Sequence, residues 1–209
     1  MIRVKICGIT NAADALAAVE AGANLLGFNF YEKSARFLTQ GAAAKIRTQL
    51  PKNVEAVGIF VNKPAAEVAA LCRSLNLHAA QLHGDEPPDA VAEVGHSVPV
   101  IKAFRVEPDF PLKTLDEYCD AFAFLFDAAH TGQYGGTGRP TDWDVARRAA
   151  KDHRIILAGG LKVENVAAAV RIVRPYGIDV ASGVESKPGK KDHGRLREFI
   201  QEVRRGEKK

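Results

Sequence analysis

The chain has 209 residues, of which 46% are hydrophobic and 26% charged, a composition that excludes fibrous and largely disordered proteins. At this length we expect one domain, residues 1–209, with a full hydrophobic core. The net charge of +4 includes Arg204, Arg205, Lys208 and Lys209 near the C-terminus, which a solvated helix end explains better than a nucleic-acid site.

Short apolar segments alternate with longer stretches of helical periodicity along the whole chain. The predicted strands are 3–7, 24–30, 55–61, 79–83, 98–104, 121–127, 155–158 and 178–181. The predicted helices are 12–21, 41–50, 64–75, 88–94, 112–118, 143–151, 163–173 and 194–204. Asn11 is placed to cap the first helix, Gly22 to end it, and Thr141 or Asp142 to cap the sixth.

Eight strand and helix units in strict alternation, at roughly 26 residues per unit, indicate a parallel α/β sheet. We predict a single-domain (β/α)8 TIM barrel. The alternative is an open doubly wound sheet. It is less favoured because no G-x-G-x-x-G motif follows the first strand and because polar residues end most of the strands.

The three cysteines, Cys7, Cys72 and Cys119, are far apart and form neither a C-x-x-C pair nor a zinc-ligand pattern. We therefore expect no disulfide framework and no metal site. The sequence contains no signal peptide and no apolar segment of membrane-spanning length, so we expect a cytoplasmic protein without a membrane partner.

Polar and small residues lie within a residue or two of each predicted strand end, where a barrel builds its active site. They are Cys7, Asn29, Asn62, His83, Arg105, Asp127, Gly159, Gly160, Ser182 and Gly183. A thiol, a carboxylate and an imidazole in one ring suggest isomerisation or elimination by acid–base catalysis.

Cys7 closes the first predicted strand, where it is either a small packing residue or a catalytic group. Gly8 would let the backbone turn tightly at the rim, and Lys5 points to the same face of the strand as Cys7. An ammonium group nearby would lower the pKa of the thiol from its free value of ~8.5, which favours Cys7 as a base.

Asp127 ends the sixth predicted strand after six apolar residues, 121–126. Its carboxyl is either a cap held by backbone donors or an acid that burial keeps protonated. The glycine-rich segment 134–138 that follows could form a lid or a phosphate cradle.

Two turns suggest a phosphate site, because loops seven and eight of such barrels commonly bind one. Gly159 and Gly160 end the seventh strand, and Ser182 and Gly183 follow the eighth, so backbone N–H groups could approach an anion closely. The alternative is that these residues only supply tight turns. Arg36 could pair with a carboxylate from the same rim, and His83 is a secondary candidate beside its alternative role in packing.

Taken in order, these motifs resemble the phosphoribosylanthranilate isomerase family of tryptophan biosynthesis over essentially the whole chain. The matching segments are K-I-C-G-I-T at 5–10, G-F-N-F at 27–30, V-G-I-F-V-N at 57–62, Q-L-H-G-D-E at 81–86, Y-G-G-T-G at 134–138, L-A-G-G-L and E-N-V within 157–166, and D-V-A-S-G-V-E and P-G-K-K-D within 179–192. One departure is Ala35, where the family usually has proline between Ser34 and Arg36.

The resemblance implies an Amadori rearrangement of N-(5-phosphoribosyl)anthranilate without a cofactor or metal. Asp127 would be the general acid, Cys7 the general base, and Arg36 the ligand of the anthranilate carboxylate. Asp179 would support the substrate, and loops seven and eight would hold its phosphate.

Three alternatives remain at this point. The first is another phosphosugar-isomerising barrel, which would carry a carboxylate in place of Cys7. The second is a silent barrel that only binds a phosphorylated metabolite, and the third is a nucleic-acid-binding module, which would need a basic stripe that the sequence lacks. We expect a small phosphoribosyl substrate, no nucleic-acid partner, and a monomer or a homodimer.

Overall fold

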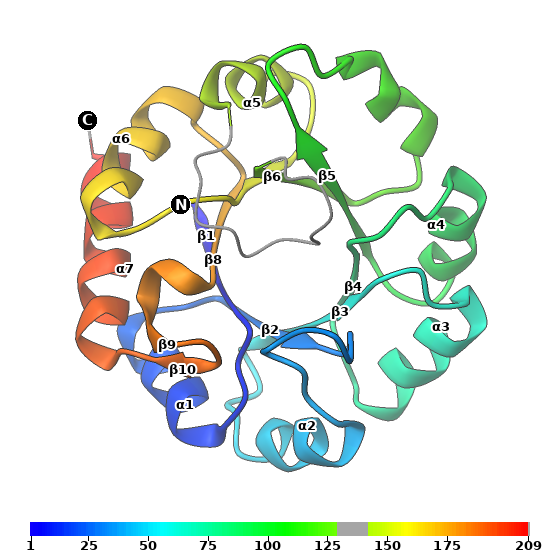
Figure 1. Ribbon diagram of the computed structural model, residues 1–209, viewed down its shortest axis with the longest axis vertical. Helices are drawn as coiled ribbons and strands as arrows, with labels where there is room; N and C mark the ends of the chain where they lie inside the picture. Colours follow the sequence, from blue (N-terminus) through cyan, green and yellow to red (C-terminus); the bar gives the residue numbers. More distant parts are fainter. Residues whose placement is uncertain (129–141, 209) are drawn as a thin grey trace.

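A computed structural model, which describes residues 1–128 and 142–208, shows eight parallel strands closed into a barrel inside a ring of helices (Figure 1). Each strand pairs with the next in the chain, and β8 returns to pair with β1. The strands are β1 (Arg3–Cys7), β2 (Leu25–Asn29), β3 (Glu55–Phe60), β4 (Ala79–Leu82), β5 (Val100–Val106), β6 (Ala123–Ala128), β7 (Ile155–Leu157) and β8 (Gly177–Val180). The predicted (β/α)8 barrel is confirmed.

A helix follows each strand and covers the outside of the barrel (Figure 1). The α-helices are α1 (Ala12–Ala21), α2 (Gln40–Arg47), α3 (Ala65–Ser74), α4 (Pro88–Gly95), α5 (Trp143–Ala149), α6 (Val163–Val173) and α7 (His193–Glu207). The predicted caps are confirmed: Asn11 accepts a hydrogen bond from the Asp14 N–H, Gly22 has φ of 103°, and Asp142 accepts from two N–H groups. Thr141 and the glycine-rich segment 134–138 lie outside the described residues.

The barrel has two apolar layers, because alternate residues of each strand point inward and outward. Outward residues such as Phe28 and Phe126 pack under the helices. Inward residues such as Leu25, Val57 and Leu125 fill the barrel itself. The same alternation directs the polar residue two positions after an inward apolar one into the barrel mouth, as with Asp127 after Leu125.

Two predicted elements differ from the structure. The segment Leu112–Tyr118 is a 3-10 helix (η1) instead of an α-helix. Only Leu115 is buried on it, so little packing favours a longer and wider helix. Strand β5 begins at Val100 because Pro99 has no N–H for the ladder, and it continues to Val106, so that Arg105 lies within the strand.

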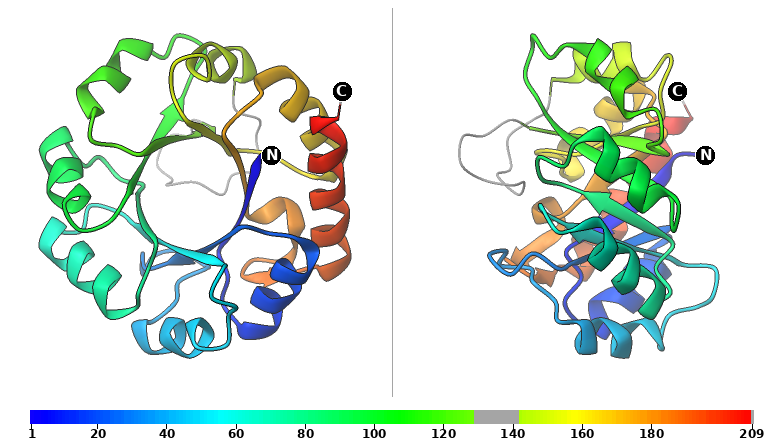
Figure 2. Two further views of the ribbon diagram at one scale, coloured as in Figure 1. Left: turned by 180° about the vertical axis from the view of Figure 1, so that it is seen from behind. Right: turned by 90° about the vertical axis from the view of Figure 1, so that its right-hand side faces the viewer.

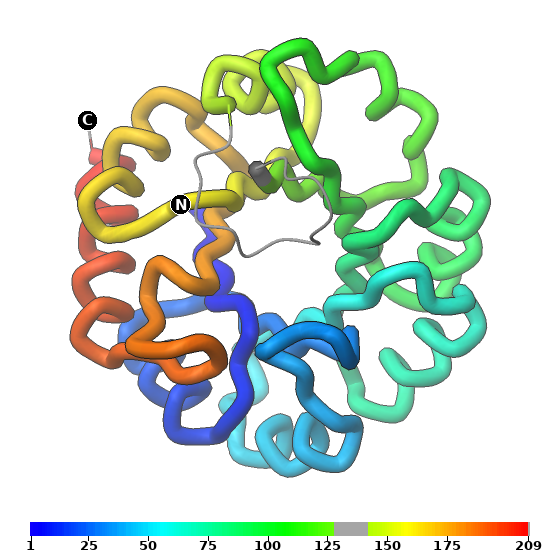
Figure 3. Tube along the Cα trace, in the orientation of Figure 1, coloured from blue at the N-terminus to red at the C-terminus, as the bar shows by residue number. Residues whose placement is uncertain are grey.

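A hairpin after β8 was not predicted. A short 3-10 turn, η2 (Ser182–Val184), leads into β9 (Glu185–Lys187), which pairs with β10 (Lys190–Lys191). In the chain trace the orange hairpin lies beside the blue segment that leaves β1, and the Thr10 hydroxyl donates to the Gly189 carbonyl there (Figure 3). Two distant parts of the sequence therefore share one side of the mouth.

The two chain ends meet at another edge of the molecule. The N-terminus lies at the end of the barrel opposite to the hairpin (Figure 2). Arg204 donates to the Ile2 carbonyl at 2.7 Å, so this arginine belongs to a tertiary contact, contrary to the expectation of a solvated helix end. Across the two described ranges, no helix has both the length and the apolar character needed to cross a bilayer.

Candidate active site

The barrel mouth holds a group of polar side chains from four strands. From β1, the Lys5 ammonium donates to Asp179 Oδ1 of β8 at 3.0 Å and to Gln81 Oε1 of β4 at 2.8 Å. Gln81 contacts His83 Nδ1 at 2.8 Å, and His83 Nε2 lies 3.6 Å from Asp127 Oδ2 of β6. The mouth thus brings together the predicted residues His83, Asp127 and Asp179.

Lys5 is buried in the barrel with only 1% of its side chain exposed. Burial alone would lower the pKa of Lys5, but attraction to Asp179 and to the Cys7 sulfur raises it. A charge that is buried this deeply is retained only with a partner, and Asp179 provides it. The residue expected mainly to activate Cys7 is therefore also the counter-ion of Asp179.

Cys7 is partly exposed at the mouth, as a reactive group must be. Burial of its sulfur raises the pKa of the thiol, and the carboxylate of Asp179 raises it further. Lys5 and Lys191 lower the pKa, but they do not offset these two effects. The expectation that Lys5 brings the thiol pKa below its free value is wrong for this structure, because burial of the sulfur and the neighbouring carboxylate outweigh the ammonium.

The hydrogen bonds fix which ring nitrogen of His83 carries the proton. An ammonium group can only donate, so Lys5 must face the Gln81 oxygen, and the amide nitrogen of Gln81 then faces His83 Nδ1. Nδ1 of the neutral ring accepts from this amide, which leaves the N–H on Nε2. That N–H faces Asp127. His83 Nε2 is buried and lies 3.6 Å from the candidate acid, too far for a hydrogen bond, and it makes no hydrogen bond within the described residues.

Arg36 lies on the rim and forms a bidentate pair with Glu185. Its Nε donates to Oε1 at 2.9 Å, and its Nη2 donates to Oε2 at 2.7 Å. The side chain passes over Gly8, where an added Cβ would lie 2.4 Å from Arg36 Cδ, and Gly8 has φ of +72°. Gly8 is thus required both for the turn and for the position of the arginine.

The loop that carries Arg36 is held without the proline that the family pattern usually has at position 35. The Ser34 hydroxyl accepts the Arg36 N–H at 3.1 Å and contacts Asn29 Nδ2 at 3.1 Å. Asn29 also accepts the Tyr31 N–H. Side-chain to backbone hydrogen bonds of this kind stabilise a turn. They hold this loop, although Ala35 lacks the rigid ring of a proline.

Asn62 and Arg105, two further predicted rim residues, also serve the loops around the mouth. The Asn62 N–H donates to Glu86, and Arg105 lies 3.6 Å from Asp85. Glu86 is buried, and it also accepts from the Gly84 N–H and from Lys102 at 2.7 Å. The pair of Lys102 and Glu86 thereby fixes the turn that follows His83.

The predicted phosphate loops form a small recess beside Asp127 and Asp179. Gly159 and Gly160 have φ of +78° and +60°, values that glycine adopts without strain. Asn165 of α6 accepts the Lys162 N–H and donates to the Gly160 carbonyl, which holds this turn in place. The residues that line the recess are Asp127, Ala158, Gly159, Gly160, Leu161, Asp179, Val180, Ala181, Ser182 and Gly183.

Gly183 is where the two loops touch. A Cβ added to Gly183 would lie 1.9 Å from the Leu161 carbonyl oxygen, so one backbone must move. We expect Gly183→Ala to weaken binding of a phosphorylated ligand by at least ~10-fold, equivalent to ~1.4 kcal/mol. Isothermal titration measures the change. Gly41→Ala is the matched control, because a Cβ at Gly41 meets no atom within 4 Å; equal affinity of both variants would contradict a recess built on this approach.

Sequence reasoning missed three residues of the mouth: Gln81, Glu185 and Lys191. Gln81 and Glu185 are in the quoted motifs Q-L-H-G-D-E and D-V-A-S-G-V-E, and Lys191 is in P-G-K-K-D. The feature of the sequence that could have identified these three residues is a charged or amide side chain next to a strand end or a turn. In residues 1–128 and 142–208, no group of three or more His, Cys, Asp and Glu side chains is arranged to hold a metal ion.

Comparison with known proteins gives one consistent result. Residues 4–202 match the family model described as N-(5'phosphoribosyl)anthranilate (PRA) isomerase. The chain is 50% identical to the N-(5'-phosphoribosyl)anthranilate isomerase of Pelobacter propionicus over 200 residues, which cover 96% of this chain and 94% of that protein.

Solved structures agree with this match. The phosphoribosyl anthranilate isomerase of Thermotoga maritima superposes with a TM-score of 0.91 at 38% identity, over 98% of this chain and 99% of that one. A phosphoribosyl anthranilate isomerase in complex with reduced 1-(o-carboxyphenylamino)-1-deoxyribulose 5-phosphate gives 0.88 at 38% identity, with the same coverage of both chains.

Proposed function

The chain belongs to the N-(5'-phosphoribosyl)anthranilate isomerase family, and we propose that Cys7 and Asp127 are the general base and general acid of its reaction. The enzyme is an isomerase of tryptophan biosynthesis. The observation that carries the proposed roles is the arrangement of the mouth. The thiol of β1 interacts with Lys5, a hydrogen-bonded chain runs from Lys5 through Gln81 to His83, and His83 lies 3.6 Å from the carboxyl of β6.

The reaction converts an aminoaldose into an aminoketose, so a proton must leave C2′ of the ribose and another must reach C1′. In the first step Asp127 gives a proton to the ring oxygen, the bond from that oxygen to C1′ breaks, and the anthranilate nitrogen supplies the electron pair of an iminium. The proton on C2′ becomes acidic because the iminium accepts its bonding electrons.

In the second step the Cys7 thiolate removes the C2′ proton and an enolamine forms. The enolamine then gains a proton at C1′ and loses the proton of its C2′ hydroxyl, which gives the ketone. The proton that Asp127 gave and the proton that Cys7 took cancel, so the product is an isomer of the substrate. The substrate's own nitrogen is the electron sink, and the proposed route therefore uses only an acid and a base. Asp179, held by Lys5, and His83, whose N–H faces Asp127, are proposed to contact the substrate.

The phosphate is proposed to lie in the recess of loops seven and eight, on the N–H groups of Gly160, Ser182 and Gly183, with Gly159 shaping the turn. The first N–H groups of a helical turn have no partner inside that turn, so η2 offers donors there. A soak with inorganic phosphate tests this position, and a bound anion elsewhere on the barrel would contradict it.

Arg36 is proposed to bind the anthranilate carboxylate. Nε and one N–H of Nη2 are directed to Glu185, and the opposite edge of the guanidinium, formed by Nη1 and the second N–H of Nη2, can take a carboxylate. Arg36→Met should weaken binding of the reduced product analogue by ~2–3 kcal/mol, or ~30- to 150-fold. The variant keeps the pair of Lys191 and Glu185, so the hairpin retains its ion pair.

Fluorescence titration measures the affinity of the Arg36→Met variant, and Arg73→Met on α3 is the control for removal of a guanidinium far from the mouth. Inorganic phosphate should bind the Arg36 variant as it binds the parent. Parental affinity for the analogue would show that another group binds the carboxylate.

The activity itself is tested by the decay of anthranilate fluorescence as N-(5'-phosphoribosyl)anthranilate is consumed by the purified chain. Turnover is expected. We further propose that residues 1–209 work as one domain in the cytoplasm, as a monomer or a homodimer, on this small substrate and without a nucleic-acid or membrane partner. Closure of the barrel from β1 to β8 supports the single domain, and sedimentation velocity determines the oligomeric state.

A further inference from the structure

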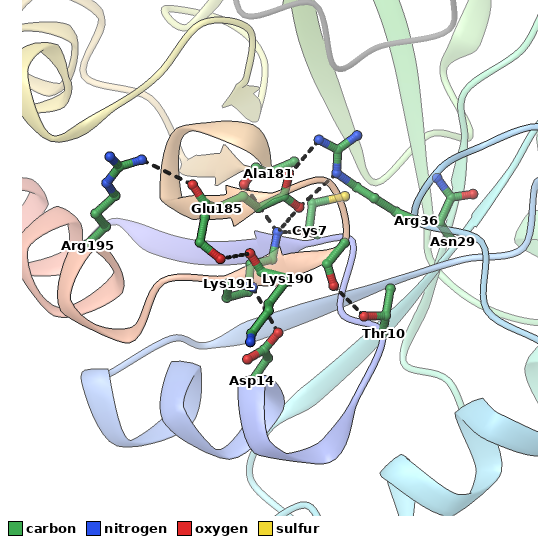
Figure 4. Close-up of polar contacts among 12 residues, drawn as sticks. Cys7, Thr10, Asp14, Asn29, Arg36, Ala181, Glu185, Lys190, Lys191 and Arg195 are labelled. Carbon is green, nitrogen blue, oxygen red and sulfur yellow. Dashed lines mark hydrogen bonds and ion pairs between the residues drawn. The ribbon is translucent and has the colours of Figure 1, made fainter.

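Glu185 is the centre of a buried ion cluster next to the mouth (Figure 4). Its carboxylate accepts the two bonds from Arg36 and a third, at 2.8 Å, from the Lys191 ammonium. The Lys191 side chain is 0% exposed and that of Glu185 is 4% exposed. Arg195 donates to the Glu185 carbonyl at 3.1 Å, so the backbone at this point is held as well.

Lys191 links this cluster to the candidate base. Its ammonium donates to the Cys7 carbonyl at 2.6 Å and to the Ala181 carbonyl at 3.2 Å, in addition to Glu185. All three N–H bonds of the ammonium are thus directed to the rim. The backbone N–H of Lys191 donates to the Asp14 carboxylate of α1 at 2.9 Å. This bond attaches the hairpin to α1. Arg36, Glu185, Lys191 and Cys7 form one chain of direct contacts.

The charges of the cluster distinguish two possible roles. Arg36 and Lys191 are cations and Glu185 is an anion, so the cluster carries one net positive charge. Burial alone would raise the pKa of Glu185, but the bond from Arg36 and the attraction of Lys191 lower it, which keeps the carboxylate ionised. An anion so close to Arg36 weakens the electrostatic attraction of that arginine for a substrate carboxylate. The buried Lys191 ammonium requires the charge of Glu185 as its counter-ion, but this requirement does not explain the two bonds that Glu185 accepts from Arg36.

We propose that Glu185 is a positioning residue that holds Arg36 with its open edge toward the mouth and, through Lys191, keeps that edge at a fixed distance from Cys7. A long arginine side chain loses rotamer entropy when a ligand immobilises it. The bidentate bond to Glu185 fixes the guanidinium plane before the ligand arrives. The free energy of ligand binding is therefore not reduced by this loss of entropy. The inference rests on the proposed role of Arg36.

The test compares two ligands that differ only in the group that Arg36 binds. The first is the reduced product analogue with its ring carboxylate, and the second is the same molecule with a plain phenyl ring. Calorimetry measures the affinity of both for the parent, for Glu185→Gln and for Arg36→Met. If Arg36→Met weakens both ligands equally, the proposed role of Arg36 fails; if Arg36→Met discriminates and Glu185→Gln does not, only the present inference fails.

We expect Glu185→Gln to weaken the carboxylate ligand by ~10-fold and the phenyl ligand by less than ~2-fold. In the Arg36→Met background the same substitution should have no further effect on the carboxylate ligand. An electrostatic role alone predicts the opposite sign, because removal of an anion should tighten binding of a carboxylate. Tighter binding, equal weakening of both ligands, or an undiminished effect without Arg36 would each overturn the proposal.

Glu185→Asp provides a second variant if Glu185→Gln does not fold. The shorter side chain keeps the negative charge beside Lys191 and withdraws the carboxylate from Arg36. We expect the same selective loss for the carboxylate ligand. Parental affinity of this variant for both ligands would show that charge alone is sufficient and would overturn the role of the bidentate contact.

Discussion

Cys7→Ser should lower kcat by at least ~100-fold and leave binding of the reduced product analogue close to that of the parent. A serine hydroxyl does not ionise to a useful extent near neutral pH, so the variant has no base for the C2′ proton. Serine also fits the site, since it is smaller than cysteine and retains a polar atom near Lys5. The loss should therefore appear in the chemical step and not in ligand affinity.

Steady-state kinetics by fluorescence gives kcat, and calorimetry gives the affinity. Cys119→Ser is the matched control, because Cys119 is exposed on the surface after η1. Near-parental kcat in Cys7→Ser would assign the proton transfer to His83 or another rim group.

The pH dependence of kcat/KM is a second test of Cys7 as the base. Burial and the Asp179 carboxylate raise the pKa of the Cys7 thiol above its ordinary value, so the thiol keeps its proton to a higher pH. The thiolate is the active form, and kcat/KM of the free enzyme should rise with pH through this raised pKa. The rising limb should be absent from Cys7→Ser. The limb belongs to the coupled groups of the mouth and not to one residue alone.

Asp127→Asn should also lower kcat by at least ~100-fold, because the amide keeps the shape of the side chain but has no acidic proton to give to the ring oxygen. Affinity for the reduced analogue should change little, since that ligand has an open chain and needs no proton. The rising limb of kcat/KM should remain, because Cys7 is still present. A lower kcat with a retained rising limb would separate the role of Asp127 as the acid from the role of Cys7 as the base.

Asp85→Asn is the control for Asp127→Asn, since Asp85 is an exposed carboxylate on the same rim. Its kcat should equal that of the parent. Parental kcat in Asp127→Asn would exclude this carboxyl as the acid, and loss of ligand affinity without loss of kcat would make it a binding group.

The barrel could be predicted because each unit repeats one local pattern. Each predicted strand overlaps an observed one, and Arg3–Cys7, Ala12–Ala21 and Val163–Val173 agree in both ends. Inward residues follow from alternation along a strand, which placed Asp127 at the mouth before its neighbours were known. Boundaries failed where one residue changed the backbone, as Pro99 did at the start of β5.

The partners of the site residues could not be predicted, since they join distant parts of the sequence. Arg36 and Glu185 are 149 positions apart, and Lys191 and Cys7 are 184 positions apart. Periodicity describes one element at a time and does not give such pairs. For the same reason Lys5 was expected to act on Cys7, while the structure adds Asp179, which has the opposite effect on the thiol.

The central claim is that one bound substrate lies between Cys7 and Asp127, and a crystal structure of the chain with the reduced product analogue tests it most directly. We expect the phosphate in the recess of Gly160, Ser182 and Gly183, and the ring carboxylate on the open edge of Arg36. Cys7 Sγ should contact C2′ at ~4 Å. An Asp127 oxygen should lie ~3 Å from the hydroxyl oxygen that closes the sugar ring in the substrate. An analogue bound with either side chain beyond reach of its atom, or with its phosphate on another loop, would contradict the account.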